Sequence, residues 1–193
     1  MTGLAMSAPG TTDDALIRAA AGGDRHAMTV LFERHRTKVF RFLMRFVRNR
    51  TTAEDLTADV FLDVWRNAGR FEGRCSVTTW MLAIARFKAL SALRARPECG
   101  IEKASIADLT DGSEDPEAAL ASKRRAKLLH ACLERLSFDH REVIDLVYYH
   151  EKTIDEVAKI TGIPLNTVKT RMFYARKRLA MELNRAGLQR ELL

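Results

Sequence analysis

The chain has 193 residues, of which 47% are hydrophobic and 30% charged, a composition that supports packed cores and excludes a disordered chain. Lys and Arg outnumber Asp and Glu by 32 to 25, so the formal net charge of +7 favours a polyanionic partner. No run approaches the roughly 18 apolar residues of a membrane span, and the first ten residues lack the apolar core of a signal peptide. We therefore expect a cytoplasmic protein.

Three cysteines, Cys75, Cys99 and Cys132, are widely separated and form no C-x-x-C pair. No His stands at metal-ligand spacing from them, so the sequence predicts neither a metal site nor a cofactor. Reduced thiols are the plain interpretation, and a redox switch at one of them is the alternative.

The charges are unevenly distributed along the chain. From Arg34 to Arg50 there are seven Lys or Arg and no acid, and from Leu165 to Arg178 there are five and again no acid. The stretch from Glu98 to Glu117 holds seven acids and a single Lys. Two basic segments thus flank an acidic middle.

Apolar residues recur at helical spacing throughout the N-terminal half, and strand patterns are nearly absent. This spacing predicts a helix over 27–47 and a second helix that a capping box at Thr51 and Glu54 opens and Gly69 ends. A third helix is expected from Trp80 to about Arg94, with Thr78 or Thr79 as its cap. Residues 13–97 are predicted to form one compact helical domain.

The periodicity fails over 98–121, where Gly, Ser and Pro stand among the acids, as expected of a flexible, solvated linker. Helical spacing resumes after it, and we expect a second small helical domain over 122–186. The predicted fold class is all-α, with two helical domains joined by a flexible acidic linker.

A helix-turn-helix is predicted near the C-terminus. Thr153 and Glu156 form a capping box, Gly162 suits a left-handed turn, and Pro164 precedes a helix over about 166–183. That helix is expected to bury Val168, Met172, Ala175 and Leu179. Its opposite side displays cations and hydroxyls that suit phosphates and base edges in a major groove: Thr167, Lys169, Thr170, Arg171, Tyr174, Arg176 and Lys177.

These residues resemble a known family. The string from Thr153 to Leu179, including Thr-Val-Lys-Thr-Arg at 167–171, is similar to the region 4 helix-turn-helix of extracytoplasmic-function (ECF) sigma factors of the sigma-70 family. The segment 53–65 resembles the family's polymerase-binding helix, and 71–86 resembles its promoter-melting segment. The resemblance covers about residues 13–186 and makes 13–97 region 2 and 122–186 region 4.

The resemblance implies a transcription initiation factor that directs core RNA polymerase to the promoters of a stress or envelope-response regulon. The implied partners are the coiled coil of the largest polymerase subunit, the polymerase flap, promoter DNA, and an inhibitory anti-sigma factor that is often linked to the membrane. The chain would then be cytoplasmic, or tethered to the membrane through that inhibitor. It would be no enzyme and would take no small-molecule substrate.

The resemblance also implies three sets of contact residues. The polymerase-binding set is Asp55, Leu56, Asp59, Phe61 and Trp65; the minus-10 set is Phe71, Ser76, Thr79, Trp80, Arg86 and Lys88; the minus-35 set is the exposed residues above together with Phe173. Core packing is the alternative interpretation for Leu56, Phe61 and Trp80. The chain departs from the family at two positions: Glu72 is acidic where the family often has a basic residue, and Cys75 falls within the same loop.

Two other functions fit parts of the sequence. An ordinary helix-turn-helix regulator with a sensory or dimerising N-terminal domain would explain the C-terminal half, although it would not need the 71–86 segment. An RNA-binding or nucleic-acid-modifying enzyme is a further alternative. The absence of G-x-x-x-x-G-K-[ST], G-x-S-x-G and H-E-x-x-H argues against an enzyme.

Overall fold

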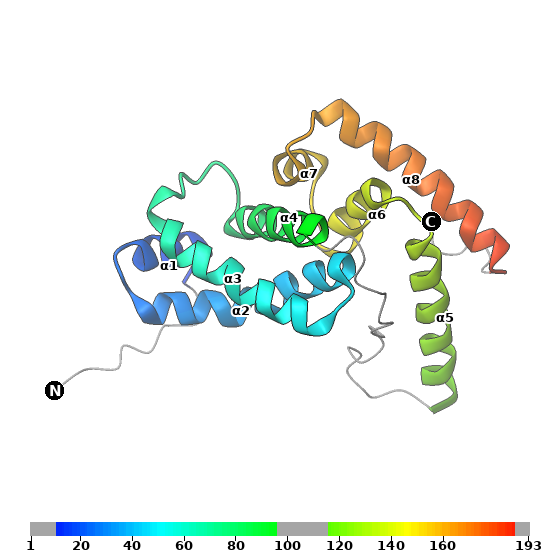
Figure 1. Ribbon diagram of the computed structural model, residues 1–193, viewed down its shortest axis with the longest axis horizontal. Coiled ribbons are helices and arrows are strands. Elements are labelled where there is room, and N and C mark those ends of the chain that lie inside the picture. Colours follow the sequence, from blue (N-terminus) through cyan, green and yellow to red (C-terminus); the bar gives the residue numbers. More distant parts are fainter. Residues whose placement is uncertain (1–10, 96–115, 188–193) are drawn as a thin grey trace. The chain divides into compact units, whose positions relative to one another are not determined.

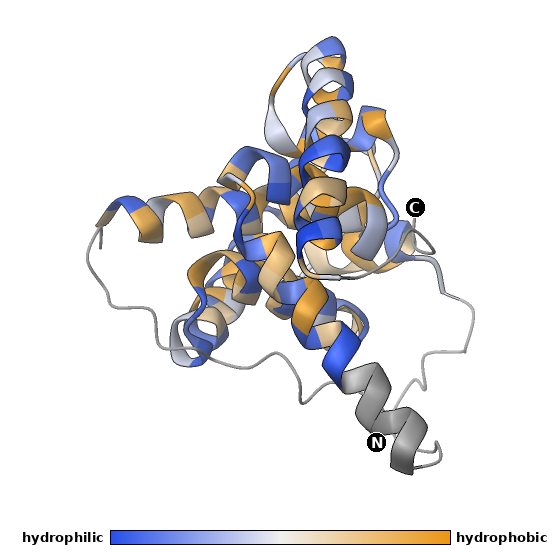
Figure 2. Ribbon diagram, turned by 90° about the vertical axis from the view of Figure 1, so that its right-hand side faces the viewer, coloured by the Kyte–Doolittle hydropathy of each residue, from blue (hydrophilic) through white to orange (hydrophobic). Residues whose placement is uncertain are grey.

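The computed structural model describes residues 11–95 and 116–187, except the side chains of 116–123. Within these residues the chain is helical and contains no strand, which confirms the all-α prediction. The helices form two compact units, one with α1–α4 and the other with α5, α6, α8 and most of α7 (Figure 1). Orange and blue bands alternate along the helices in Figure 2, as expected of helices that bury one side.

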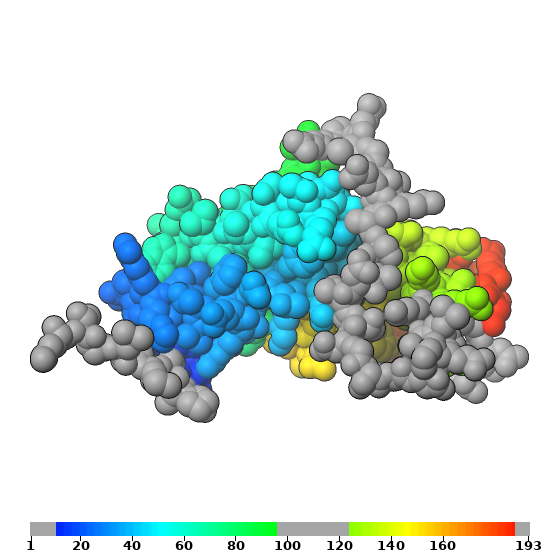
Figure 3. Space-filling model, turned by 90° about the horizontal axis from the view of Figure 1, so that it is seen from below, coloured from blue at the N-terminus to red at the C-terminus, as the bar shows by residue number. Residues whose placement is uncertain are grey.

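The N-terminal unit is built around one long central helix. Its elements are α1 (Asp13–Ala21), α2 (Arg25–Val47), α3 (Arg50–Asn67), a 3₁₀ turn η1 (Ala68–Arg70) and α4 (Val77–Ala95). Helix α2 packs against α1, α3 and α4, and Figure 3 shows α2 and α3 side by side. The core side chains include Leu31, Phe42, Leu43, Val60 and Leu82, all fully buried. Helices α3 and α4 are thereby both packed against α2.

The caps of α3 and α4 differ from the predicted ones. The Asn49 side chain accepts a hydrogen bond from the Thr52 amide (2.8 Å), so Asn49 caps α3 one residue before Arg50, and the predicted cap Thr51 lies within the helix. Ser76 Oγ accepts from the Thr79 amide (3.3 Å) at the start of α4, in place of the predicted Thr78 or Thr79. Asn, Ser and Thr are all good caps, so composition alone did not distinguish these positions.

Polar contacts hold α1 to α2. His35 is buried on α2, and its Nε2 lies 2.7 Å from an Asp13 carboxylate oxygen at the start of α1. Arg34 donates to the other Asp13 oxygen (3.1 Å) and to the Thr11 carbonyl (2.7 Å). Burial lowers the pKa of His35, and the nearby Asp13 carboxylate opposes that shift. At neutral pH this residue is therefore a neutral hydrogen-bond donor to Asp13.

The C-terminal unit contains α5 (Pro116–Glu134), α6 (Phe138–Ile144), a π-helical turn η3 (Asp145–Tyr149), most of α7 (Ile154–Thr161) and α8 (Leu165–Arg185). Helix α8 packs against α6 and α5. The predicted linker over 98–121 lies mostly outside the described residues. Its last six positions belong to α5, which begins at Pro116, a residue well suited to the first position of a helix.

A buried carboxylate joins α5 to α8. Glu182 on α8 is only 2% exposed, and its oxygens face three arginines: Arg135 after α5 (3.2 Å), Arg178 (3.4 Å) and Arg185 (3.3 Å) on α8. A charge this deeply buried is retained when it is paired and hydrogen-bonded. The three guanidinium groups supply that compensation.

Candidate nucleic-acid and protein interfaces

The helix-turn-helix forms as predicted. The Thr153 hydroxyl accepts from the Glu156 amide (3.2 Å) while the Glu156 carboxylate accepts from the Thr153 amide (3.1 Å), a complete capping box at the start of α7. Gly162 takes the left-handed conformation with φ of 70°, and its amide donates to the Ala158 carbonyl. The chain then turns at Pro164 into α8.

The predicted minus-35 residues lie outside the buried seam of α8. Val168, Met172, Ala175 and Leu179 are buried, as the helical spacing predicted. Phe173 and Tyr174 are exposed aromatic residues that meet edge to face, with ring centroids 5.3 Å apart. Of the remaining predicted contacts, Lys169, Thr170, Arg176 and Lys177 are exposed, and Thr167 and Arg171 are half-buried.

Arg171 and Arg176 lie on opposite flanks of that buried seam, because successive residues of an α-helix are about 100° apart. Each flank faces the preceding segment of the same unit. Arg171 Nη2 lies 2.9 Å from Asp139 Oδ2 on α6, and the Arg176 guanidinium carbon lies 5.8 Å from the ring centroid of Tyr148 on η3. The centre of the outward face is left to Thr170, Lys177 and the two aromatic rings.

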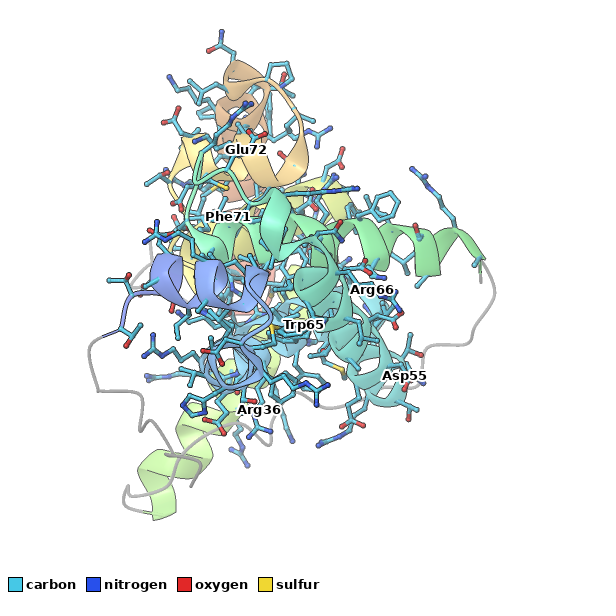
Figure 4. All side chains as sticks on the ribbon, turned by 90° about the vertical axis from the view of Figure 1, so that its left-hand side faces the viewer. Arg36, Asp55, Trp65, Arg66, Phe71 and Glu72 are labelled. Atoms are coloured by element: carbon cyan, nitrogen blue, oxygen red, sulfur yellow. The ribbon has the colours of Figure 1, made fainter. Side chains whose placement is uncertain are left out.

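The predicted polymerase-binding residues lie along α3, with Asp55 near its beginning and Trp65 near its end (Figure 4). Asp55 and Asp59 are exposed, and Leu56 and Trp65 are half-buried. Phe61 is a core residue, 5% exposed, with its ring edge to face against Phe32 at 4.8 Å between centroids. The alternative interpretation of Phe61 as core therefore holds.

Sequence reasoning missed an exposed apolar side chain on α3. Leu62 is 49% exposed, directly after the buried Phe61. The signal was present, because Leu62 falls off the helical stripe of Val60, Phe61 and Val64. On α4, Phe87 is likewise exposed.

The loop between η1 and α4 brings together two of the predicted minus-10 residues. Phe71 and Trp80 stack at a tilt, with ring centroids 5.3 Å apart, and both rings are half-buried. Figure 4 shows Phe71 and Glu72 in this loop. Ser76 is exposed, whereas Thr79 is 1% exposed, and their hydroxyl oxygens are 2.8 Å apart. The Thr79 side chain therefore orders the start of α4 rather than facing outward.

The two predicted cations of α4 differ in their surroundings. Lys88 Nζ lies 2.9 Å from an Asp63 oxygen and 3.9 Å from an Asp59 oxygen, so two carboxylates of α3 hold it. Arg86, two residues earlier on α4, is half-buried. Lys88 thus connects the predicted polymerase-binding helix to the predicted promoter-melting helix.

The described residues show no other kind of site. Among residues 11–95 and 116–187, no group of three or more His, Cys, Asp or Glu is placed to hold a metal ion. In the same part of the chain, no helix combines the length and the apolar character that crossing a bilayer requires.

Comparison with known proteins identifies the family. Residues 31–97 match the family model Sigma-70 region 2, and residues 126–179 match Sigma-70, region 4. The curated "ECF RNA polymerase sigma factor SigK" of Mycobacterium ulcerans (strain Agy99) is 31% identical over 171 residues, which cover 85% of this chain and 90% of the relative.

Two solved structures share the fold. CnrH, solved in complex with the cytosolic domain of CnrY, matches with a TM-score of 0.67 at 23% identity over 89% of this chain and 97% of CnrH. The sigma factor RpoE, solved in complex with the anti-sigma factor NepR from Bartonella quintana, matches with a TM-score of 0.66 at 24% identity over 81% of this chain and 96% of RpoE. Together with the curated relative and both region models, they agree with the predicted architecture. The chain therefore belongs to the ECF sigma factors of the sigma-70 family, which are transcription initiation factors that direct RNA polymerase and are not enzymes.

Proposed function

We propose that the two units act at two promoter elements, with residues 13–97 binding polymerase and opening the minus-10 element and residues 122–186 reading the minus-35 element. The observation that carries this division is the outward face of α8. Helix α8 is the second helix of a helix-turn-helix whose turn has a left-handed Gly162, and its outward face presents cations, hydroxyls and aromatic rings with no acid from Leu165 to Lys177. Phosphates and base edges of a duplex suit such a face.

For the minus-35 element we assign different roles to the centre and the flanks of α8. Thr170 and Lys177 are exposed at the centre of the outward face, where they enter the groove first. Phe173 and Tyr174 beside them offer apolar contact to thymine methyl groups. Thr167 and Lys169, near the start of the helix, suit phosphate contacts. Arg171 and Arg176 reach the DNA from the flanks.

For the minus-10 element we propose that the Phe71–Trp80 pair receives an unstacked base. Opening a duplex requires bases to leave the stack, and aromatic rings with an exposed side compensate for the lost stacking. We assign Ser76 and Arg86 to contacts with the unpaired strand. We reassign Thr79 to positioning, because it is buried and its hydroxyl pairs with that of Ser76. We keep Lys88 as a contact of this element, with its ammonium group held by the Asp59 and Asp63 carboxylates of α3.

For polymerase binding we propose a surface on α3 made of Asp55, Leu56, Asp59 and Trp65, with Leu62 added. Leu62 supplies the exposed apolar anchor that the core residue Phe61 does not. Protein interfaces typically place such an anchor among flanking charges that set the orientation. The coiled coil of the largest subunit is the partner we assign to this surface, and the flap is assigned to the C-terminal unit.

We further propose that an anti-sigma factor holds the chain inactive. The support is the family, together with two structural relatives that were solved with partner proteins, one of them named as an anti-sigma factor. We place the chain in the cytoplasm, where polymerase is, with tethering to the membrane only through such an inhibitor.

The experiment that tests this division compares variants in reconstituted holoenzyme. Lys177→Ala with Thr170→Ala should weaken promoter binding at least tenfold and leave affinity for core polymerase unchanged. Leu62→Ala with Asp55→Ala should weaken binding to core polymerase. Met181→Ala, at an exposed position farther along α8, is the matched control and should change neither promoter binding nor affinity for core polymerase. If the α8 variant binds promoter DNA as the unaltered chain does, the recognition face is misassigned.

A further inference from the structure

The ion pair between Asp139 and Arg171 has no role in the function described so far. Asp139 stands in the first turn of α6, and its carboxylate lies 2.9 Å from the guanidinium of a recognition-helix arginine. We propose that Asp139 is a specificity-determining positioning residue, which restrains Arg171 so that it contacts a matching base edge rather than any phosphate. This inference rests on the proposed role of α8 in minus-35 recognition.

Folding stability does not account for the pair. The Arg171 side chain is 26% exposed and that of Asp139 is 49% exposed, and ion pairs with this much solvent contribute little to stability. An acid next to a DNA-binding face also repels phosphates, so it lowers the affinity of the surface for every sequence. Specificity is a difference of affinities, and a group that weakens all binding can still increase that difference.

The geometry explains how the difference arises. An unrestrained arginine on a flexible side chain finds a phosphate on duplex DNA of any sequence. When Asp139 binds one Nη group, the guanidinium keeps further N–H donors in a fixed orientation, and these suit the paired acceptors of a guanine. A phosphate contact must first break the ion pair, whereas a base contact in the right register need not.

The other flanking arginine is restrained by the same segment. Arg176 lies over the ring of Tyr148 on the π-helical turn η3, at 5.8 Å from the centroid, which is within cation–π range. Both arginines are thus held by side chains that precede the helix-turn-helix in the sequence. Thr170 and Lys177, at the centre of the outward face, have no such restraint from α6 or η3 among the described contacts.

The test compares Asp139→Asn holoenzyme with the unaltered holoenzyme on a promoter fragment and on the same fragment with its upstream element scrambled. Freed from Asp139, Arg171 gains a phosphate contact, so the salt slope for the scrambled fragment should steepen by about 0.9. At 0.15 M salt, this added contact should raise the affinity of the variant holoenzyme for the scrambled fragment about fivefold, with 1 M salt taken as the reference at which the contact contributes nothing. The ratio of promoter to scrambled affinity should therefore fall about fivefold.

Two controls isolate the effect. Glu134→Gln removes the same charge from an exposed residue of α5, whose carboxylate lies 3.7 Å from His130, and it should leave the ratio unchanged. In an Arg171→Ala background, Asp139→Asn should have no further effect on the ratio, because the cation it restrains is gone. An effect of equal size in that background would mean that Asp139 acts through α6 or through net charge, and would overturn the inference.

The outcomes also distinguish a failure of this inference from a failure of the proposed minus-35 recognition by α8. If Arg171→Ala weakens promoter binding while Asp139→Asn leaves the ratio and the slope unchanged, the positioning role fails and the recognition helix stands. If neither Arg171→Ala nor the Lys177 and Thr170 variant affects promoter binding, the recognition helix itself is misassigned.

Discussion

Glu182→Gln is expected to destabilise the C-terminal unit by about 2 kcal/mol. The carboxylate accepts charge-assisted hydrogen bonds from Arg135 and Arg185, and each loses about 1 kcal/mol when the acceptor becomes neutral. We add nothing for Arg178, because its contact with Glu182 at 3.4 Å is an ion pair and not one of these two hydrogen bonds. For a unit of this size, 2 kcal/mol corresponds to a fall in Tm of about 8–16 °C.

The assay is thermal unfolding of the full chain, with hydrogen exchange of the α5 and α8 amides as the measure of unfolding in the C-terminal unit. Both tryptophans, Trp65 and Trp80, lie in the N-terminal unit, so tryptophan fluorescence reports that unit alone. The unfolding temperature of the N-terminal unit should not change. Glu134→Gln, at an exposed position of α5, should shift stability by less than about 0.5 kcal/mol. If α5 and α8 unfold at the same temperature in the unaltered chain and in Glu182→Gln, the buried carboxylate does not stabilise this unit.

Three further predictions concern other parts of the chain. Because burial lowers the pKa of His35, the unfolded chain binds a proton below about pH 6.5 that the folded chain does not. The free energy of unfolding of the N-terminal unit should therefore fall as pH drops from 7 to 5, and His35→Gln should flatten that profile in urea titrations followed by tryptophan fluorescence. Phe61→Ala should cost about 3–5 kcal/mol of stability, whereas Leu62→Ala should cost little and weaken pulldown of core polymerase; equal stability losses would contradict the assignment. Burial raises the pKa of the Cys132 thiol, so Cys132 should be alkylated far more slowly than the half-buried Cys75 in the native chain, as measured by mass spectrometry, with equal rates in denaturant.

The sequence predicted the helices and the helix-turn-helix because those features have local causes. The capping box at Thr153 and Glu156, the left-handed Gly162 and the spacing of Val168 and Met172 are all set within a few residues. Family resemblance then assigned roles to the helices.

What the sequence did not predict depends on contacts between distant residues. Asp139 and Arg171 are 32 positions apart, and nothing local marks them as a pair. The choice of Phe61 rather than Leu62 for the core depends on where α2 packs. Glu182 carried a signal that was overlooked, because it continues the buried stripe through Ala175 and Leu179, and an acid in such a stripe requires cations nearby.

We propose that the two units recognise two elements of one promoter. It is tested most directly by sequencing the 5′ ends of RNA that core polymerase makes on host genomic DNA with and without the chain. We predict discrete start sites that require the chain and share two upstream motifs at a constant separation, with scrambling of the distal motif abolishing the transcript. Start sites that core polymerase produces equally well alone, or that share only one motif, would contradict the account.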